Sequence, residues 1–126
     1  MNLSMVVLLF VFSGFVSGTE EEFYSDTYDN VDIDAILGNE RLVKQYMNCI
    51  LDKGSCTADG RSLRRILPDA LATTCKKCNQ RQREIARKIG NYLKTNRPEE
   101  WAEFVRKFDP NNQYIVPFDR FLAKVE

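Results

Sequence analysis

The sequence contains no histidine among its 126 residues. This absence excludes a Ser-His-Asp triad, a Cys-His catalytic pair and any metal site with a histidine ligand. The numbers of basic and acidic residues are equal, 18 of each, so the chain lacks the strong positive field that attracts nucleic acid. No catalytic set of residues is recognisable. We therefore expect no enzyme activity, no nucleic-acid partner, no metal and no cofactor.

The net charge of zero conceals an uneven distribution of charge along the chain. Residues 19–40 hold eight acidic residues and no basic one, whereas residues 41–97 hold 14 basic and four acidic ones. Residues 98–126 hold six acidic and four basic ones. We predict that the acidic residues 20–34 form an extended arm that faces the basic body, and that salt weakens this contact.

Residues 1–18 carry no charged side chain and include an unbroken apolar run, Met5–Phe12. Small residues at Val16 and Gly18 are typical of a signal-peptide cleavage site. A transmembrane anchor is the alternative, but the run is shorter than the ~20 apolar residues that span a bilayer. The pattern predicts a signal peptide at 1–18, a helical domain at 19–126, and a secreted, extracellular protein without stable membrane insertion.

Four cysteines, Cys49, Cys56, Cys75 and Cys78, lie in the predicted mature part. In an oxidising compartment, an even number of cysteines in a small domain indicates disulfides. Of three connectivities, the local pairs Cys49–Cys56 and Cys75–Cys78 are the simplest. A four-cysteine zinc site and a redox Cys-x-x-Cys motif are the alternatives. Uneven spacing argues against the former, and the lack of a strand pattern argues against the latter.

No segment alternates between apolar and polar residues with period two, and apolar residues recur instead at helical spacing. This periodicity predicts an all-α fold of about six helices. Asn39 and Asp59 are candidate caps for two of them, one of which should end near Gly54. The longest periodic stretch is basic and should be helical from Cys75 to Lys94, and Pro98 should open the next helix.

The apolar stripes contain several side chains with a polar or adaptable end. Such residues fit an ordinary core, but they also suit a lined cavity. The basic residues between 76 and 94 similarly allow two interpretations, a solvated face or a surface for anionic lipid or nucleic acid. Tyr92 on the apolar face argues against RNA binding. The residues with a polar or adaptable end are Tyr28, Tyr46, Met47, Tyr92, Trp101 and Tyr114.

The spacing Cys49-x6-Cys56-x18-Cys75-x2-Cys78 resembles that of the insect chemosensory proteins, a four-cysteine, OS-D-like family. The runs YDNVD at 28–32, LPDAL at 67–71, NRPEEW at 96–101 and FDP at 108–110 are similar as well. The similarity covers nearly the whole predicted mature chain. It implies about six helices that enclose an apolar channel, and the same two local disulfides.

The resemblance also implies reversible binding of small hydrophobic molecules: pheromone components, odorants, long-chain fatty acids, alcohols or esters. We expect a monomeric carrier, with a receptor as a further candidate partner. The alternative is a secreted interaction protein that acts in development or defence through the basic surface helix around 81–88. We expect seven residues to line the channel and bind the ligand. Some of them match channel positions of the family, and the others lie on the apolar stripes. The predicted ligand-binding residues are Tyr28, Tyr46, Leu63, Ile66, Leu67, Ile89 and Trp101.

Overall fold

A computed structural model describes residues 23–124 of the chain. The predicted signal peptide at 1–18 lies outside the described residues. Within residues 23–124 every regular element is a helix, which confirms the predicted all-α fold. In chain order these elements are α2 (Ile33–Leu37), α3 (Glu40–Ile50), α4 (Ala58–Thr73), α5 (Gln80–Asn96), α6 (Pro98–Phe108) and α7 (Ile115–Ala123).

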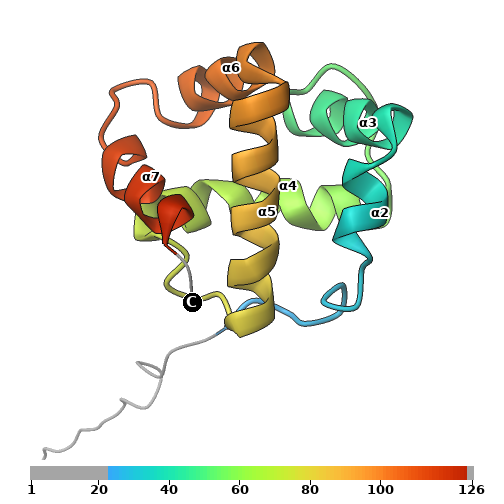
Figure 1. Cartoon of the computed structure of the whole chain (residues 1–126), viewed down its shortest axis with the longest axis horizontal. Coiled ribbons are helices and arrows are strands. Elements are labelled where there is room, and N and C mark those ends of the chain that lie inside the picture. The colour runs from blue at the N-terminus through green and yellow to red at the C-terminus, as the bar shows by residue number, and fades with distance from the viewer. Residues whose placement is uncertain (1–22, 125–126) are drawn as a thin grey trace, which may run out of the picture.

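The helices are arranged around α5, which stands upright at the centre of the view in Figure 1. Helix α4 crosses behind it, α6 covers its upper end, and α7 lies on the side opposite α2 and α3. Helix α5 contacts α2, α6 and α7, while α3 contacts both α2 and α4. The chain before α2 passes behind the lower end of α5, and we call its described residues 23–31 the arm (Figure 1).

Side chains cap the first turns of several helices. The Asn39 carboxamide accepts the Leu42 amide at 3.2 Å, which confirms Asn39 as the cap of α3. The predicted cap Asp59 is wrong, because Thr57 caps α4 and Asp59 lies inside its first turn. The Asp59 carboxylate nevertheless accepts the Gly60 amide at 2.9 Å, so it still stabilises this helix end.

The long basic helix starts later than predicted, at Gln80 instead of Cys75. The preceding residues Thr74 and Cys75 have left-handed backbone conformations, with φ of 59° and 62°, and these interrupt any helix. Asn79 then caps α5 through a reciprocal capping box with Gln82. This asparagine and glutamine, three residues apart, are the sequence signal that places the helix start correctly.

Two further helix features concern the ends of α3 and α4. Helix α3 ends at Ile50, and Asp52 rather than Gly54 takes the left-handed conformation behind it, with φ of 64°. Helix α4 continues past Pro68 to Thr73. Aspartate is among the few non-glycine residues that adopt the left-handed conformation readily. The chain after α3 therefore turns at Asp52, before it reaches Gly54.

The disulfides join Cys49 to Cys56 and Cys75 to Cys78, which confirms the local pairing. The first connects the end of α3 to the segment before α4, and the second closes the turn between α4 and α5. The Cα atoms of Cys75 and Cys78 are 5.1 Å apart, close to the separation expected on a helix, although they lie in a turn.

The core is closely packed where α5 meets α7. A Cβ atom on Gly90 would lie 2.8 Å from the methyl groups of the Leu122 side chain, so a larger residue at this position would force Leu122 to move. At the start of α7 the buried Asp109 carboxylate accepts the backbone amides of Gln113, Tyr114 and Ile115. This buried charge is therefore hydrogen-bonded.

Candidate ligand-binding cavity

An apolar cavity with a volume of about 230 Å³ lies in the core between the helices. A void that holds one water molecule needs only about 10–15 Å³, so this space is far larger than an ordinary packing defect. The arm, the turn between α4 and α5, and each described helix from α2 to α7 contribute to its wall. Most of the lining side chains are aliphatic or aromatic. The arrangement suits an elongated apolar molecule better than a polar substrate.

All seven residues predicted from the sequence to bind ligand lie in the wall of this one cavity. They come from five separate parts of the chain: the arm, α3, α4, α5 and α6. Met47 also lines the cavity, whereas Tyr92 and Tyr114 pack against the core outside the lining. Whether these side chains contact a ligand stays a prediction; the seven are Tyr28, Tyr46, Leu63, Ile66, Leu67, Ile89 and Trp101.

The cavity wall also contains residues that the sequence-based prediction missed. Tyr24 and Asp29 of the arm, and Asp59 and Gln82 at the starts of two helices, belong to it. The apolar side of α2 contributes as well, and its hydrophobic spacing was visible in the sequence. Tyr24 had no such signal, since its hydrogen-bond partner Asp69 is 45 residues away.

Tyr46 and Asp59 form a hydrogen-bonded pair in the wall, with the tyrosine hydroxyl as donor. Burial, followed by the hydrogen bond to Asp59, raises the pKa of Tyr46 to about 12. Burial alone would raise the pKa of Asp59, but hydrogen bonds from Thr57, Tyr46 and the Gly60 amide outweigh it and lower this pKa. At neutral pH Asp59 is therefore ionised and Tyr46 is protonated.

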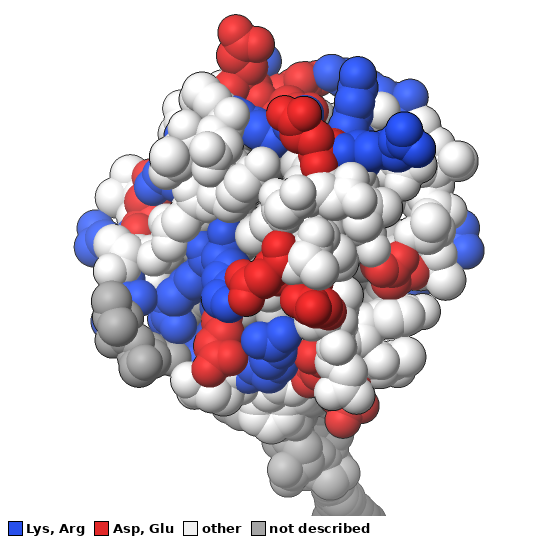
Figure 2. All heavy atoms as spheres, turned by 45° about the vertical axis from the view of Figure 1, so that its right-hand side comes forward, with Lys and Arg blue, Asp and Glu red and all other residues white. Residues whose placement is uncertain are grey.

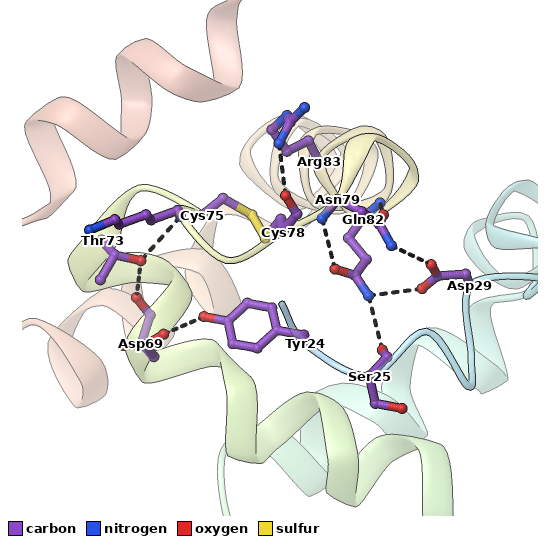
Figure 3. The surroundings of a disulfide bond; sticks show 11 residues. Tyr24, Ser25, Asp29, Asp69, Thr73, Cys75, Cys78, Asn79, Gln82 and Arg83 are labelled. Atoms are coloured by element: carbon purple, nitrogen blue, oxygen red, sulfur yellow. Dashed lines mark hydrogen bonds between the residues drawn. A yellow bond between two sulfur atoms is a disulfide. The ribbon is translucent and has the colours of Figure 1, made fainter. Parts of the chain in front are cut away.

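A second tyrosine–aspartate pair connects the arm to α4. The Tyr24 hydroxyl donates to Asp69 at 2.5 Å, and burial together with this bond raises the pKa of Tyr24. Figure 3 shows the Tyr24 ring reaching toward Asp69, beside the disulfide turn of Cys75 and Cys78. The Tyr24 amide also donates to the Lys77 carbonyl in this turn at 3.1 Å. The arm thus closes the cavity on this side.

The rest of the arm is attached to the start of α5. The Asp29 carboxylate accepts the side-chain amides of Asn79 at 2.7 Å and Gln82 at 2.9 Å, and Gln82 also donates to the Ser25 carbonyl (Figure 3). Arg81 donates to the Asp29 carbonyl at 3.1 Å. The described arm therefore does face the basic helix. The contacts between them are mainly hydrogen bonds that involve side-chain amides and backbone carbonyls, rather than ion pairs.

The other basic residues at 81–88 also make contacts within the chain. Arg83 donates to a carbonyl of the disulfide turn at 2.8 Å. Arg87 donates to the Phe121 carbonyl and lies 4.2 Å from the centre of the Phe121 ring. Lys88 pairs with Asp34 at 2.9 Å. On the face shown in Figure 2, basic and acidic side chains lie next to one another rather than in a patch of one sign.

No group of three or more Cys, Asp or Glu side chains within residues 23–124 is placed to hold a metal ion. No helix in this part of the chain is long and apolar enough to span a membrane.

The sequence matches a family model described as the insect pheromone-binding family, A10/OS-D, over residues 24–116. Ejaculatory bulb-specific protein 3 of Drosophila melanogaster is 43% identical over 110 residues, which cover 87% of either chain. Allergen Tha p 1 of Thaumetopoea pityocampa is 41% identical over 124 residues, which cover 98% of either chain.

Solved structures with the same fold include a chemosensory protein in complex with bromo-dodecanol. It is 38% identical with a TM-score of 0.71, over 77% of this chain and 98% of that one. Antennal chemosensory protein A6 of the moth Mamestra brassicae is also 38% identical, with a TM-score of 0.66 over 79% and 94% of the two chains. These matches confirm the resemblance drawn from the cysteine spacing. The chain therefore belongs to the insect pheromone-binding family A10/OS-D, and it is similar to chemosensory proteins over most of its length.

Proposed function

We propose that the chain is a secreted carrier that reversibly binds small hydrophobic molecules in its internal cavity. The apolar cavity of about 230 Å³ is the observation that carries this proposal. The chemosensory protein solved with bromo-dodecanol supports it, because that ligand combines a long alkyl chain with one small polar head. The ligand classes we expect are pheromone components, odorants, long-chain fatty acids, alcohols and esters.

The affinity of such a carrier would come from the transfer of methylene groups out of water. Each methylene contributes about 0.8 kcal/mol, so a dozen supply ~10 kcal/mol before the costs of association and ordering. Once these costs are subtracted, the free energy of binding corresponds to dissociation constants in about the micromolar range. Binding of this strength is reversible, as release of a carried molecule requires.

The proposal gives the wall residues different roles. Leu63, Ile66 and Ile89 supply aliphatic surface for the alkyl chain. Tyr28 lines the cavity and is 43% exposed, so it marks an opening toward solvent. Trp101 lines the cavity beside Phe104, with ring centres 5.4 Å apart, and as the chain's single tryptophan it would report on occupancy through its fluorescence.

Secretion rests on the signal-peptide pattern at 1–18 and on the two disulfides, which persist in oxidising compartments. A monomeric state and a receptor partner stay predictions. The alternative function, a secreted interaction protein that acts through residues 81–88, also stays a prediction. The contacts that these residues make inside the chain do not favour it.

A displacement assay with an apolar fluorescent probe tests the carrier function. Alkan-1-ols of about 10 to 18 carbons should displace the probe, with affinity rising up to about fourfold per methylene until the cavity is full. Trp101 fluorescence should change with occupancy. If no chain length competes and Trp101 fluorescence is indifferent to every ligand, the carrier function is wrong.

Two substitutions on α4 provide a matched control for the site of binding. Ala70 is buried in the cavity wall, whereas Ala72 is exposed and outside the lining. Ala70→Ile should reduce the cavity and shorten the preferred ligand, while Ala72→Ile should leave the chain-length optimum unchanged. An unchanged optimum in a folded Ala70→Ile variant would place the ligand elsewhere.

A further inference from the structure

Among the described residues, the lining of the cavity includes acidic side chains but no basic ones. Two carboxylates, Asp29 and Asp59, belong to the lining. None of the residues within 23–124 that line the cavity is Lys or Arg. An anionic head group that entered this space would lose its water shell and would meet like charges instead of a cation. Both effects oppose the binding of a carboxylate.

The helix starts beside the cavity do not offer an anion site either. Backbone amides at a helix N-terminus commonly bind anions. At the start of α4 the Asp59 carboxylate already accepts the Gly60 amide at 2.9 Å. At the start of α5 the Asp29 carboxylate already accepts the side chains of Asn79 and Gln82 (Figure 3). The Asp59 carboxylate at α4 and the Asn79–Gln82 capping box at α5 thus already accept backbone amides where a ligand's carboxylate would otherwise bind.

At the Tyr46–Asp59 pair, the hydrogen-bonding capacity of the wall favours a ligand that donates. The Tyr46 hydroxyl proton is used in the bond to Asp59, so the tyrosine oxygen and the carboxylate present lone pairs. The Tyr24 hydroxyl proton is likewise used in the bond to Asp69. An alcohol can donate its hydroxyl proton to the Tyr46–Asp59 pair, whereas an ester or a carboxylate brings only acceptors.

We propose that the cavity selects long-chain alcohols over the corresponding esters and carboxylates, with the Tyr46–Asp59 pair accepting the ligand hydroxyl and Asp59 and Asp29 excluding anionic heads. This selectivity rests on the carrier function proposed above and narrows its ligand classes. Free fatty acids become the least favoured of them. The raised pKa of Tyr46 and the lowered pKa of Asp59 support the assignment, since they keep the pair in this protonation state at neutral pH.

Three ligands of matched chain length test the selectivity on the unmodified protein: dodecan-1-ol, methyl dodecanoate and dodecanoate at pH 7.4, all below their aggregation limits. The alcohol should bind about tenfold or more tightly than the carboxylate, with the ester between them. Equal affinities for the three ligands would overturn the selectivity and leave the carrier function standing. Failure of all three to displace the probe would instead overturn the carrier function itself.

An Asp59→Asn variant tests the charge directly, because asparagine retains an acceptor for Tyr46 at nearly the same size. It should bind dodecanoate at least about threefold more tightly and change dodecan-1-ol affinity much less. Asp119→Asn is the matched control, since Asp119 lies outside the lining and pairs with Lys94. Thermal unfolding confirms that each variant is folded. A folded Asp59→Asn variant with the same alcohol-to-carboxylate ratio as the unmodified protein would overturn the role of Asp59.

Discussion

Two tyrosine–aspartate contacts hold α4 against its neighbours, and they are built differently. Tyr46 on α3 donates to Asp59 in the first turn of α4, 13 residues along the chain. Tyr24 on the arm donates to Asp69 in the second half of α4, 45 residues along the chain. Both tyrosines line the cavity. A tyrosine and an aspartate therefore close the cavity wall at two places. In one pair the two residues are close in the sequence, and in the other they are far apart.

The difference lies in what supports each contact. The Cys49–Cys56 disulfide falls between Tyr46 and Asp59 and covalently closes that loop. The Cys75–Cys78 disulfide shapes the turn beside the second contact but does not join the arm to anything. The arm is held by partly exposed hydrogen bonds and by neither of these disulfides, and such a segment opens before the rest of a domain. We therefore expect the arm side of the cavity to open first, and the α3–α4 side to stay closed.

The largest expected effect comes from removal of each disulfide in turn by paired substitution to alanine. Chain-entropy reasoning gives a loss of about 2.5 kcal/mol in unfolding free energy for C49A/C56A and about 2 kcal/mol for C75A/C78A. Denaturant unfolding measures both values. Cys49 and Cys75 are each 2% exposed, but Cys78 is buried and Cys56 only partly so, and truncation therefore adds a little more to the loss for C75A/C78A. A much larger loss for C75A/C78A would mean that the arm side depends on its disulfide more than the α3–α4 side does.

A smaller effect is expected from alkaline pH. The pKa of Tyr46 is about 12 in the folded chain against 10.0 for the unperturbed group, so folding favours its protonated form. Its contribution to stability is fully present below pH 10 and is lost as pH rises to about 12. Since Tyr46 is half-buried, screening by solvent limits the loss to about 1 kcal/mol.

Unfolding free energies measured between pH 9 and 12 check this dependence. Tyr46→Phe should flatten it, and so should Tyr24→Phe, because the pKa of Tyr24 is raised as well. Tyr114→Phe is the matched control, since it removes a tyrosine hydroxyl outside the cavity lining. If Tyr46→Phe keeps the full alkaline loss of the unmodified protein, the Tyr46–Asp59 contact does not contribute to stability in this range.

The smallest expected effect is that of salt on the arm. Asp34, just after the arm in the sequence, forms an ion pair with Lys88. The side chains of Lys88 and Asp34 are 44% and 73% exposed, and such exposed pairs contribute at most about 1 kcal/mol to stability. In 1 M salt the Debye length falls to ~3 Å, so this attraction is screened. Protease cleavage of the arm should rise about two- to threefold in 1 M salt and further in Tyr24→Phe. Cleavage that does not change with salt would show that ion pairing has no part in holding the arm.

Local interactions account for the features that the sequence predicted well. Asn39 caps α3 through a residue three positions away, and the spacing of apolar residues marks α3 to α7. The disulfides are local too, with partners seven and three residues apart. The prediction was less accurate where local signals compete, as at Cys75. There the helical periodicity extends back to Cys75. The left-handed backbone conformations of Thr74 and Cys75 nevertheless keep the residues before Gln80 out of the helix.

The helical fold, the two disulfides and a set of apolar residues suited to a cavity wall can all be predicted from the sequence, because periodicity, capping and short loops depend on neighbours along the chain. The sequence does not reveal that these residues share one cavity, that Tyr24 closes it through Asp69, or that Asp29 and Asp59 belong to its wall. Their positions depend on how α4 and α5 cross and where the arm docks. The residues concerned are dozens of positions apart, and their contacts form only when the helices pack together.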